Sequence, residues 1–211
     1  MAETFPYEQL DGARFQRLAQ CLIVRLYNDV QCLPLSGADG GRDAIQLIND
    51  GEHVKDAVIF QVKFKEPEPL VSDFHDKLYK WLIKQLTAEL PKLQKLKDRG
   101  ACRYVVITNI TGSGSLESGM RDKAAAWAAS NMPLSTIFWW RDDVDARLAS
   151  NTDLVFRFNL FTGPDSVRAI IESRHSNGFA APVRINESPG PILALMSYVA
   201  NQYESDAILR F

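Results

Sequence analysis

Three polar residues with the chemistry needed to hydrolyse a phosphodiester stand beside two short apolar segments. Asp43 directly precedes segment 44–49, and Gln61 and Lys63 stand near the end of the strongly apolar segment 57–64. Side chains alternate along a strand, so Gln61 and Lys63 are expected on one face of theirs. Carboxylate and amide oxygens are ligands for a hard cation, and an ammonium group stabilises the negative charge of a transition state. These three residues are therefore the candidate catalytic residues.

A β-hairpin is the element that would bring the three residues together. Segments 44–49 and 57–64 are rich in β-prone residues, and Asp50-Gly51 between them is a turn signal. Antiparallel pairing about the middle of this loop puts Asp43 opposite Lys63. The carboxylate and ammonium groups are then expected to converge on one small region.

A divalent cation is the cofactor that such a centre requires. The Asp43 carboxylate, the Gln61 amide oxygen and the Val62 backbone carbonyl could supply its oxygen ligands, with Mg2+ expected and Mn2+ as the alternative. A bound cation lowers the pKa of a water molecule and neutralises charge on a phosphate. Lys63 would orient the attacking water and stabilise the transition state. The residues thus predict a metal-dependent phosphodiester hydrolase.

The residues around this centre resemble a known family of nucleases. Run 37–43 (Gly-Ala-Asp-Gly-Gly-Arg-Asp) and run 60–63 (Phe-Gln-Val-Lys) are similar to the Gly-Asp-Gly-Gly-x-Asp and Gln-x-Lys signatures of Mrr-like restriction endonucleases, of the PD-(D/E)xK superfamily. In that family the second Asp and the Gln-x-Lys pair are active-site residues, which correspond here to Asp43, Gln61 and Lys63. The resemblance implies an Mg2+-dependent deoxyribonuclease.

The resemblance covers roughly residues 7–150 and has one departure. Many relatives carry a Glu after a Phe in the first helix as a further metal-site carboxylate, whereas this chain has Phe15-Gln16. Gln16 would then act indirectly, by hydrogen bonding to a metal ligand, or Glu8 would replace the missing carboxylate. Whether one metal ion or two would bind stays open.

Segment 137–147 (Ile-Phe-Trp-Trp-Arg-Asp-Asp-Val-Asp-Ala-Arg) carries a second resemblance. It is similar to the end of such nuclease domains where they form the N-terminal part of bacterial antiviral STAND NTPases. This implies an effector domain of an antiphage defence protein, activated when a C-terminal module beyond these residues assembles a homo-oligomer. The alternative is a catalytically inactive nuclease fold that binds nucleic acid or mediates protein assembly.

Basic and glycine residues near the centre are candidate contacts to double-stranded DNA. Residues 61–103 hold ten Lys and Arg against six Asp and Glu, although the whole chain has a net charge of -2. Binding to phosphates relies on such local positive charge. The candidate DNA-binding residues are Gly40, Gly41, Arg42, Lys65, Lys77 and Lys80.

The remaining patterns predict an α/β fold with a central mixed sheet and helices on both faces. Helices are expected at 7–28, at 73–99 with a kink or break at Pro91, at 120–130 and at 142–149. Strands are expected at 30–35, 44–49, 57–64, 103–110 and 135–140. Residues 1–152 would form the nuclease domain, and residues 153–211 a connector with a short helical appendage, patterned at 167–174 and 192–203.

Composition restricts the class of protein. The 211 residues are 46% hydrophobic and 24% charged, which is typical of a packed domain. No stretch approaches the roughly 18 apolar residues of a membrane span, and the N-terminus has no signal-peptide pattern. Cys21, Cys32 and Cys102 are too few and too widely spaced for a disulfide framework or zinc site. A cytoplasmic location without membrane contact is therefore expected.

Overall fold

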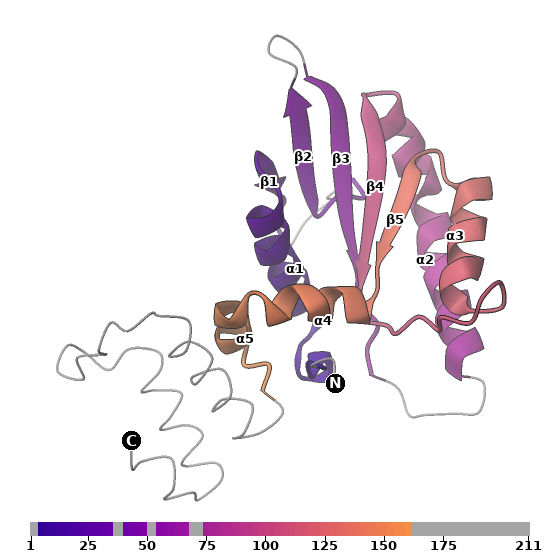
Figure 1. Ribbon diagram of the computed structural model, residues 1–211. Coiled ribbons are helices and arrows are strands. Elements are labelled where there is room, and N and C mark those ends of the chain that lie inside the picture. Colours follow the sequence, from indigo (N-terminus) through magenta and orange to yellow (C-terminus); the bar gives the residue numbers. More distant parts are fainter. Residues whose placement is uncertain (1–3, 36–39, 50–53, 68–73, 162–211) are drawn as a thin grey trace, which may run out of the picture. The chain divides into compact units, whose positions relative to one another are not determined.

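The sheet at the centre of the fold follows the order of the sequence. The computed structural model describes residues 4–35, 40–49, 54–67 and 74–161. The strands in these ranges are β1 (Val30–Cys32), β2 (Ala44–Asn49), β3 (Val54–Lys63), β4 (Ala101–Thr108) and β5 (Ser135–Trp139) (Figure 1). β1, β2 and β3 pair antiparallel, whereas β4 and β5 continue the sheet in parallel. The expected mixed sheet is confirmed.

Helices cover both faces of this sheet. They are the 3-10 turn η1 (Tyr7–Gln9) and the helices α1 (Gly12–Leu26), α2 (Phe74–Lys97), α3 (Met120–Asn131), α4 (Arg141–Ala149) and α5 (Thr152–Phe158). α2 and α3 pack together against β4 and β5 on one face (Figure 1). α1 contacts β3, and α4 contacts β4 and β5, on the other face. The expected α/β architecture is therefore confirmed.

Leucines explain why α2 packs lengthwise on the sheet. They recur along the helix at spacings of three, four and seven residues, which places them on one face. The buried ones are Leu78, Leu82, Leu86, Leu93 and Leu96, and they pack with Ile59 of β3 and with Tyr104 and Val106 of β4. Full burial of a leucine stabilises the fold by roughly 2 kcal/mol. This packing holds α2 over the strand that carries Gln61 and Lys63.

Aromatic rings fill the opposite face of the sheet. Phe60 of β3 packs edge-on against Tyr27, with ring centroids 5.1 Å apart, and against Trp139 at 6.4 Å. Successive side chains of a strand point to opposite faces. Because Phe60 points away from α2, Gln61 points toward the α2 face, and so does Lys63.

The first helix begins later than the sequence pattern suggested. The expected helix from Tyr7 to Asn28 is a separate 3-10 turn followed by α1, which starts at Gly12. The Asp11 carboxylate accepts a hydrogen bond from the Arg14 backbone N–H at 2.7 Å. An aspartate in this position satisfies an N–H group that has no partner inside the helix. This cap defines the start of α1.

Pro91 does not divide α2, contrary to the expectation from the sequence. The helix runs without interruption from Phe74 to Lys97. Proline lacks the N–H group that would bond to the Thr87 carbonyl. Both Pro91 and Thr87 are exposed, so water can satisfy that carbonyl.

The first compact unit includes α5, and β1 ends earlier than expected. By contacts between residues this unit runs to Leu160. β1 stops at Cys32 rather than near Leu35, and Pro34 has no N–H with which to extend the ladder. The turn signal at 50–51 and the helical patterns at 167–174 and 192–203 lie outside the described residues.

Candidate active site

The buried Asp43 carboxylate lies directly before β2 and accepts hydrogen bonds from α1 and β3. Its Oδ2 accepts hydrogen bonds from the Gln61 amide at 2.8 Å and from the Val62 backbone N–H at 2.6 Å. Its Oδ1 accepts a hydrogen bond from the Gln16 amide of α1. The residue is 3% exposed. These hydrogen bonds hold the carboxylate against Gln61 and Val62, near the C-terminal end of β3.

The register of the hairpin differs from the expected one by two residues. Ala44 pairs with Phe60, two residues short of its expected partner on β3. The pairing also shifts at the loop end of β2, and a turn signal in the sequence does not reveal such an irregularity. Asp43 was expected opposite Lys63 and instead lies beside Gln61.

Gln61 carries a buried acceptor that the described residues leave unused. Its Nε2 donates to Asp43, but its Oε1 has no hydrogen-bond partner within the described part of the chain. The residue is 5% exposed. A buried polar atom without a partner costs about 1–3 kcal/mol. A cation or donor that reaches this oxygen would remove that cost.

Lys63 lies two residues further along β3, on the same face as Gln61. Its Nζ donates to the Glu89 Oε1 of α2 at 2.8 Å. The side chains of Lys63 and Glu89 are only 11% and 9% exposed. The second carboxylate oxygen of Glu89 lies 2.8 Å from the Lys92 Nζ. The lysine amine is thus held by an ion pair at the edge of the core.

The Glu89 carboxyl is ionised in this arrangement. Burial raises its pKa, but the hydrogen bonds and positive charges of Lys63 and Lys92 outweigh burial and bring the pKa below its ordinary value. A buried pair of this kind is sensitive to the loss of either member, because the remaining charge would then lack compensation. Glu89 therefore orients the Lys63 amine.

The glycine turn before Asp43 brings the backbone close to Glu89. Gly40 and Gly41 have φ angles of +62° and +81°, a region that side chains disfavour. A Cβ atom on Gly41 would lie 2.8 Å from the Glu89 Oε2 and 3.0 Å from the Lys92 Cδ. The turn therefore needs glycine for its conformation and for its approach to α2. Positions 36–39 of the turn lie outside the described residues.

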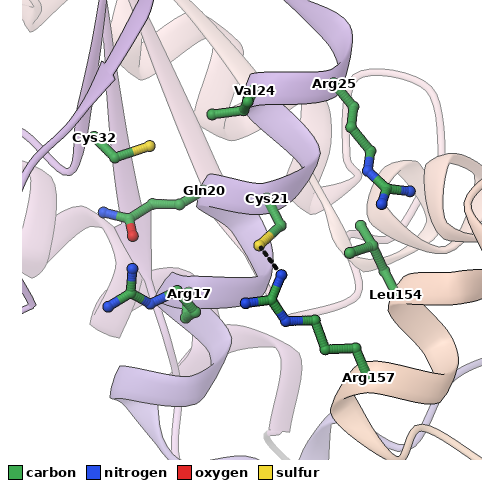
Figure 2. A pocket seen from close by; sticks show the side chains of 8 residues that line it. All are labelled: Arg17, Gln20, Cys21, Val24, Arg25, Cys32, Leu154 and Arg157. Carbon is green, nitrogen blue, oxygen red and sulfur yellow. Dashed lines mark hydrogen bonds between the residues drawn. The ribbon is translucent and has the colours of Figure 1, made fainter. Parts of the chain in front are cut away.

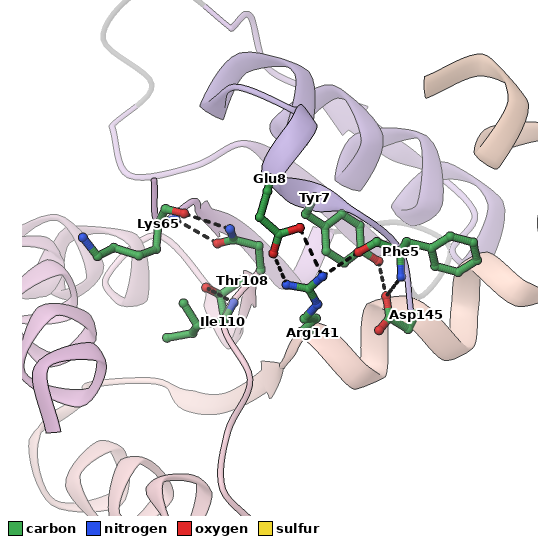
Figure 3. A network of polar contacts seen from close by, with 9 residues as sticks. Phe5, Tyr7, Glu8, Lys65, Thr108, Ile110, Arg141 and Asp145 are labelled. Carbon is green, nitrogen blue, oxygen red and sulfur yellow. Dashed lines mark hydrogen bonds and ion pairs between the residues drawn. The ribbon is translucent and has the colours of Figure 1, made fainter. Parts of the chain in front are cut away.

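The Glu8 carboxylate contacts Arg141 of α4. Figure 3 shows its carboxylate against the Arg141 guanidinium at the start of α4, with a second contact between Arg141 Nη2 and Glu8 Oε2 at 3.3 Å. The guanidinium also donates to the Phe5 carbonyl at 2.6 Å. Burial raises the pKa of Glu8, and the hydrogen bond and charge of Arg141 bring it below its ordinary value. Of the two indirect candidates, Gln16 reaches Asp43, whereas the contacts of Glu8 are with α4.

The candidate DNA-binding lysines lie at different distances from this centre. Lys65 follows β3, where its backbone exchanges two hydrogen bonds with the Asn109 side chain, at 2.8 and 2.9 Å (Figure 3). Lys77 and Lys80 are exposed on α2, about 18 Å and about 14 Å from Glu89 along the helix axis at 1.5 Å per residue. Arg42 is half-buried beside Gly40.

Glu89 and Lys92 belong to this centre and were not expected from the sequence. Glu89 stands in the leucine stripe of α2, three residues after Leu86 and four before Leu93. A charged residue at a core position of a helix is rarely buried unless it has a partner. That break in the apolar stripe is the signal that would have identified it.

The donor set for a metal ion contains few carboxylates. No group of three or more His, Cys, Asp and Glu side chains suited to a metal occurs within the described ranges. Asp43 supplies one carboxylate, and the Gln61 side chain supplies an oxygen that has no partner among the described residues. Oxygen donors of this kind suit Mg2+, which retains several water molecules when bound to proteins. The residues therefore fit one weakly held hard cation.

Comparison with protein-family models, with curated proteins and with solved structures gave no match for this chain. Among the helices that the structure describes, none has the length and apolar character to cross a membrane.

Proposed function

We propose that this chain is a metal-dependent endonuclease that hydrolyses phosphodiester bonds in double-stranded DNA. One observation carries the proposal: a buried carboxylate, a buried amide oxygen without a partner among the described residues and an oriented lysine amine come together where β2 begins and β3 ends. The residues are Asp43, Gln61 and Lys63. The resemblance of their sequence motifs to Mrr-like nucleases points to the same reaction.

Asp43 and Gln61 would hold a Mg2+ or Mn2+ ion, with the Val62 backbone carbonyl as a further ligand. The Gln61 amide can exchange the positions of its nitrogen and oxygen by rotating, so this side chain can offer an acceptor in place of a donor. The Gln16 amide, bonded to the other oxygen of Asp43, would keep the carboxylate oriented. The ion would neutralise charge on the phosphate and acidify a water molecule.

Lys63 would stabilise the negative charge that accumulates on the phosphate in the transition state. Its side chain is long and flexible, so a fixed partner reduces the number of conformers that must be restricted during the reaction. Glu89 is that partner, and we assign it the role of a positioning residue. Lys92 forms an ion pair with the second oxygen of the same carboxylate.

The basic side chains around the centre support a nucleic-acid substrate. Sequence-independent binding of DNA depends on Lys and Arg contacts to phosphates. The half-buried Arg42 at the glycine turn and the exposed Lys77 and Lys80 on α2 would bind the backbone on either side of the cleavage position. The three free cysteines of the described chain fit a reducing compartment, and we place the reaction in the cytoplasm.

Assembly into a homo-oligomer would activate the nuclease, as the resemblance to the effector domains of antiviral STAND NTPases implies. One weakly bound cation per centre would give a single copy low activity. Cleavage that is as fast per chain in dilute monomer as in an assembled form would exclude this mode of activation.

Nicking of supercoiled plasmid DNA tests the proposal. Wild-type protein should nick the plasmid with Mg2+ and not with EDTA. Asp43→Asn keeps the shape of the side chain and removes its charge, and it should abolish nicking. Asp142→Asn, an exposed aspartate on α4, serves as the matched control. Metal-dependent binding without cleavage in the wild type would instead favour an inactive nuclease fold that binds nucleic acid.

A further inference from the structure

A polar cavity lies between α1, β1 and α5. It has a volume of about 260 Å3 and is lined by polar side chains that include Arg17, Arg25, Arg157, Gln20, Cys21 and Cys32 (Figure 2). Three of these side chains carry guanidinium groups, and none of the described residues that line the cavity is Asp or Glu. The cavity is therefore suited to an anion.

The three arginines differ in how far their charges are compensated. Arg25 forms an ion pair with the Asp153 carboxylate, through two hydrogen bonds. Arg157 donates to the Cys21 Sγ at 3.7 Å, a long contact with a weak acceptor. Arg17 has no hydrogen bond or ion pair with any described residue, and it is exposed. Arg17 and Arg157 therefore keep donors available for a ligand.

Gln20 provides an independent indication of a ligand. Its Nε2 donates to the Leu33 carbonyl at 2.8 Å and to the Asp43 carbonyl at 2.9 Å. Its Oε1 is buried and has no partner among the described residues, and the whole residue is 2% exposed. Figure 2 shows this amide lining the cavity. The cavity thus combines guanidinium donors with one unused acceptor.

We infer that this cavity binds a phosphate monoester that also carries a hydroxyl group, such as a sugar phosphate or nucleotide. Arg17 and Arg157 bind the phosphate oxygens, for which guanidinium groups are well suited. A hydroxyl of the ligand donates to the Gln20 Oε1. The volume is below the roughly 300–1,000 Å3 of pockets that hold drug-sized ligands, so it accommodates the phosphate and the adjoining sugar.

This site is separate from the proposed metal centre but is connected to it. Gln20 lines the cavity and also holds the backbone carbonyl of Asp43. A ligand that bonds to the Gln20 Oε1 therefore stabilises the side chain that fixes the start of β2. Binding itself requires neither the metal ion nor the carboxylate of Asp43.

The cysteines of the chain provide a direct measurement of binding. Cys21 and Cys32 line the cavity, whereas Cys102 is a free, exposed thiol on β4 that does not. Burial and the charge of Cys21 raise the pKa of Cys32, and the charge of Arg17 lowers it. A phosphate on Arg17 would therefore slow the alkylation of Cys32 by charge as well as by shielding.

The experiment follows alkylation of the full chain by iodoacetamide at each cysteine, by mass spectrometry, in EDTA. Ribose 5-phosphate should slow alkylation of Cys21 and Cys32 and leave Cys102 unchanged. Inorganic phosphate should protect the same two thiols only at higher concentration, because it lacks the sugar hydroxyls. A blunt DNA duplex without terminal phosphates is the third probe. Protection by the duplex alone would contradict the monoester assignment.

Two test variants and two controls separate specific binding from general shielding. Arg17→Gln and Arg157→Gln should each weaken protection by about tenfold, the loss expected for one charged hydrogen bond. Arg103→Gln, an exposed arginine on β4, should not change it. Asp43→Asn should also retain protection, even if the nuclease proposal fails. Unchanged alkylation with every probe, or full protection in both arginine variants, would overturn the inference.

Discussion

Two buried carboxylates of this protein, Asp43 and Asp145, are held in different ways. Asp145 of α4 accepts hydrogen bonds from the Tyr7 hydroxyl at 2.7 Å and from the Phe5 N–H at 3.5 Å. Asp43 accepts its hydrogen bonds from α1 and from β3. Both residues are at most 5% exposed, so burial alone does not distinguish a structural carboxylate from a candidate metal ligand.

The two carboxylates also differ in the polar groups around them. Around Asp145, burial raises the pKa of the carboxyl above its ordinary value despite the Tyr7 hydrogen bond, and burial and this carboxylate raise the pKa of Tyr7. These contacts join the N-terminal segment to α4. Around Asp43, the Gln61 Oε1 has no partner among the described residues, and the oriented Lys63 follows on the same strand. This acceptor and the Asp43 carboxylate are the two side-chain oxygen donors that we propose for the cation.

The largest expected effect is on catalysis. Lys63→Met removes the ammonium group but keeps an unbranched side chain, and it should reduce the rate of plasmid nicking by about 100-fold or more. Lys84→Met, at an exposed position on α2, is the matched control and should stay close to the wild-type rate. Similar rates in all three proteins would remove Lys63 from the reaction.

The second effect is on stability and concerns the other carboxylate. Asp145→Ala leaves the buried Tyr7 hydroxyl without its acceptor, and it should lower the free energy of unfolding by about 2–3 kcal/mol. Asp142→Ala, on the exposed side of the same helix, should change it by less than about 0.5 kcal/mol. Urea titration followed by circular dichroism measures both. At a temperature where the variants are folded, metal-dependent nicking should remain; its loss in Asp145→Ala would argue against a purely structural role.

The third effect tests the unused oxygen. Gln61→Glu replaces the donor to Asp43 by a second carboxylate, so repulsion should destabilise the protein by about 1–2 kcal/mol in EDTA. Mg2+ should recover the lost stability, because a cation between two carboxylates stabilises the folded state. Gln46→Glu on β2, at a partly exposed position, should show no such dependence. Thermal melting with and without Mg2+ gives the comparison, and equal Mg2+ effects in both variants would contradict it.

The smallest effect concerns the acid dependence of Glu89. Its folded pKa lies below the ordinary value of 4.5, so its stabilising contribution is complete above about pH 4.5 and is lost as the pH falls through the lowered pKa. Glu89→Gln keeps an oxygen that can accept from Lys63 and removes only the charge, so it should be less stable than wild type at neutral pH by about 1 kcal/mol. The difference should shrink in acid. Urea titrations at several pH values measure it, with the exposed Glu66→Gln as control.

The sequence was sufficient for most of the fold because its periodic patterns are strong. The leucine stripe of α2 and the apolar run of β4 identify their elements directly. Features that depend on single local contacts were harder to predict. Asp11 caps α1, and the exposed position of Pro91 allows α2 to continue. Such contacts decide where an element ends, not whether it forms.

Only part of the candidate centre could be predicted from the sequence. Motif spacing placed Asp43 and Gln61 on neighbouring strands, but the strands pair about a centre one residue earlier than expected, so Asp43 lies beside Gln61 and not opposite Lys63. Glu89 comes from a helix more than twenty residues later in the chain, and no local motif links it to Lys63. The contact exists because the leucines of α2 pack across β3 and β4. A long-range contact of this kind cannot be predicted without the three-dimensional packing.

Binding of Mn2+, measured by electron paramagnetic resonance, tests the central claim most directly. The wild-type chain should bind Mn2+ saturably, and Asp145→Asn should bind it equally well. Asp43→Asn should lose this binding, because it removes the one carboxylate that lies beside the Gln61 amide. Equal Mn2+ binding by Asp43→Asn and the wild type would contradict the assignment of this centre as a metal site.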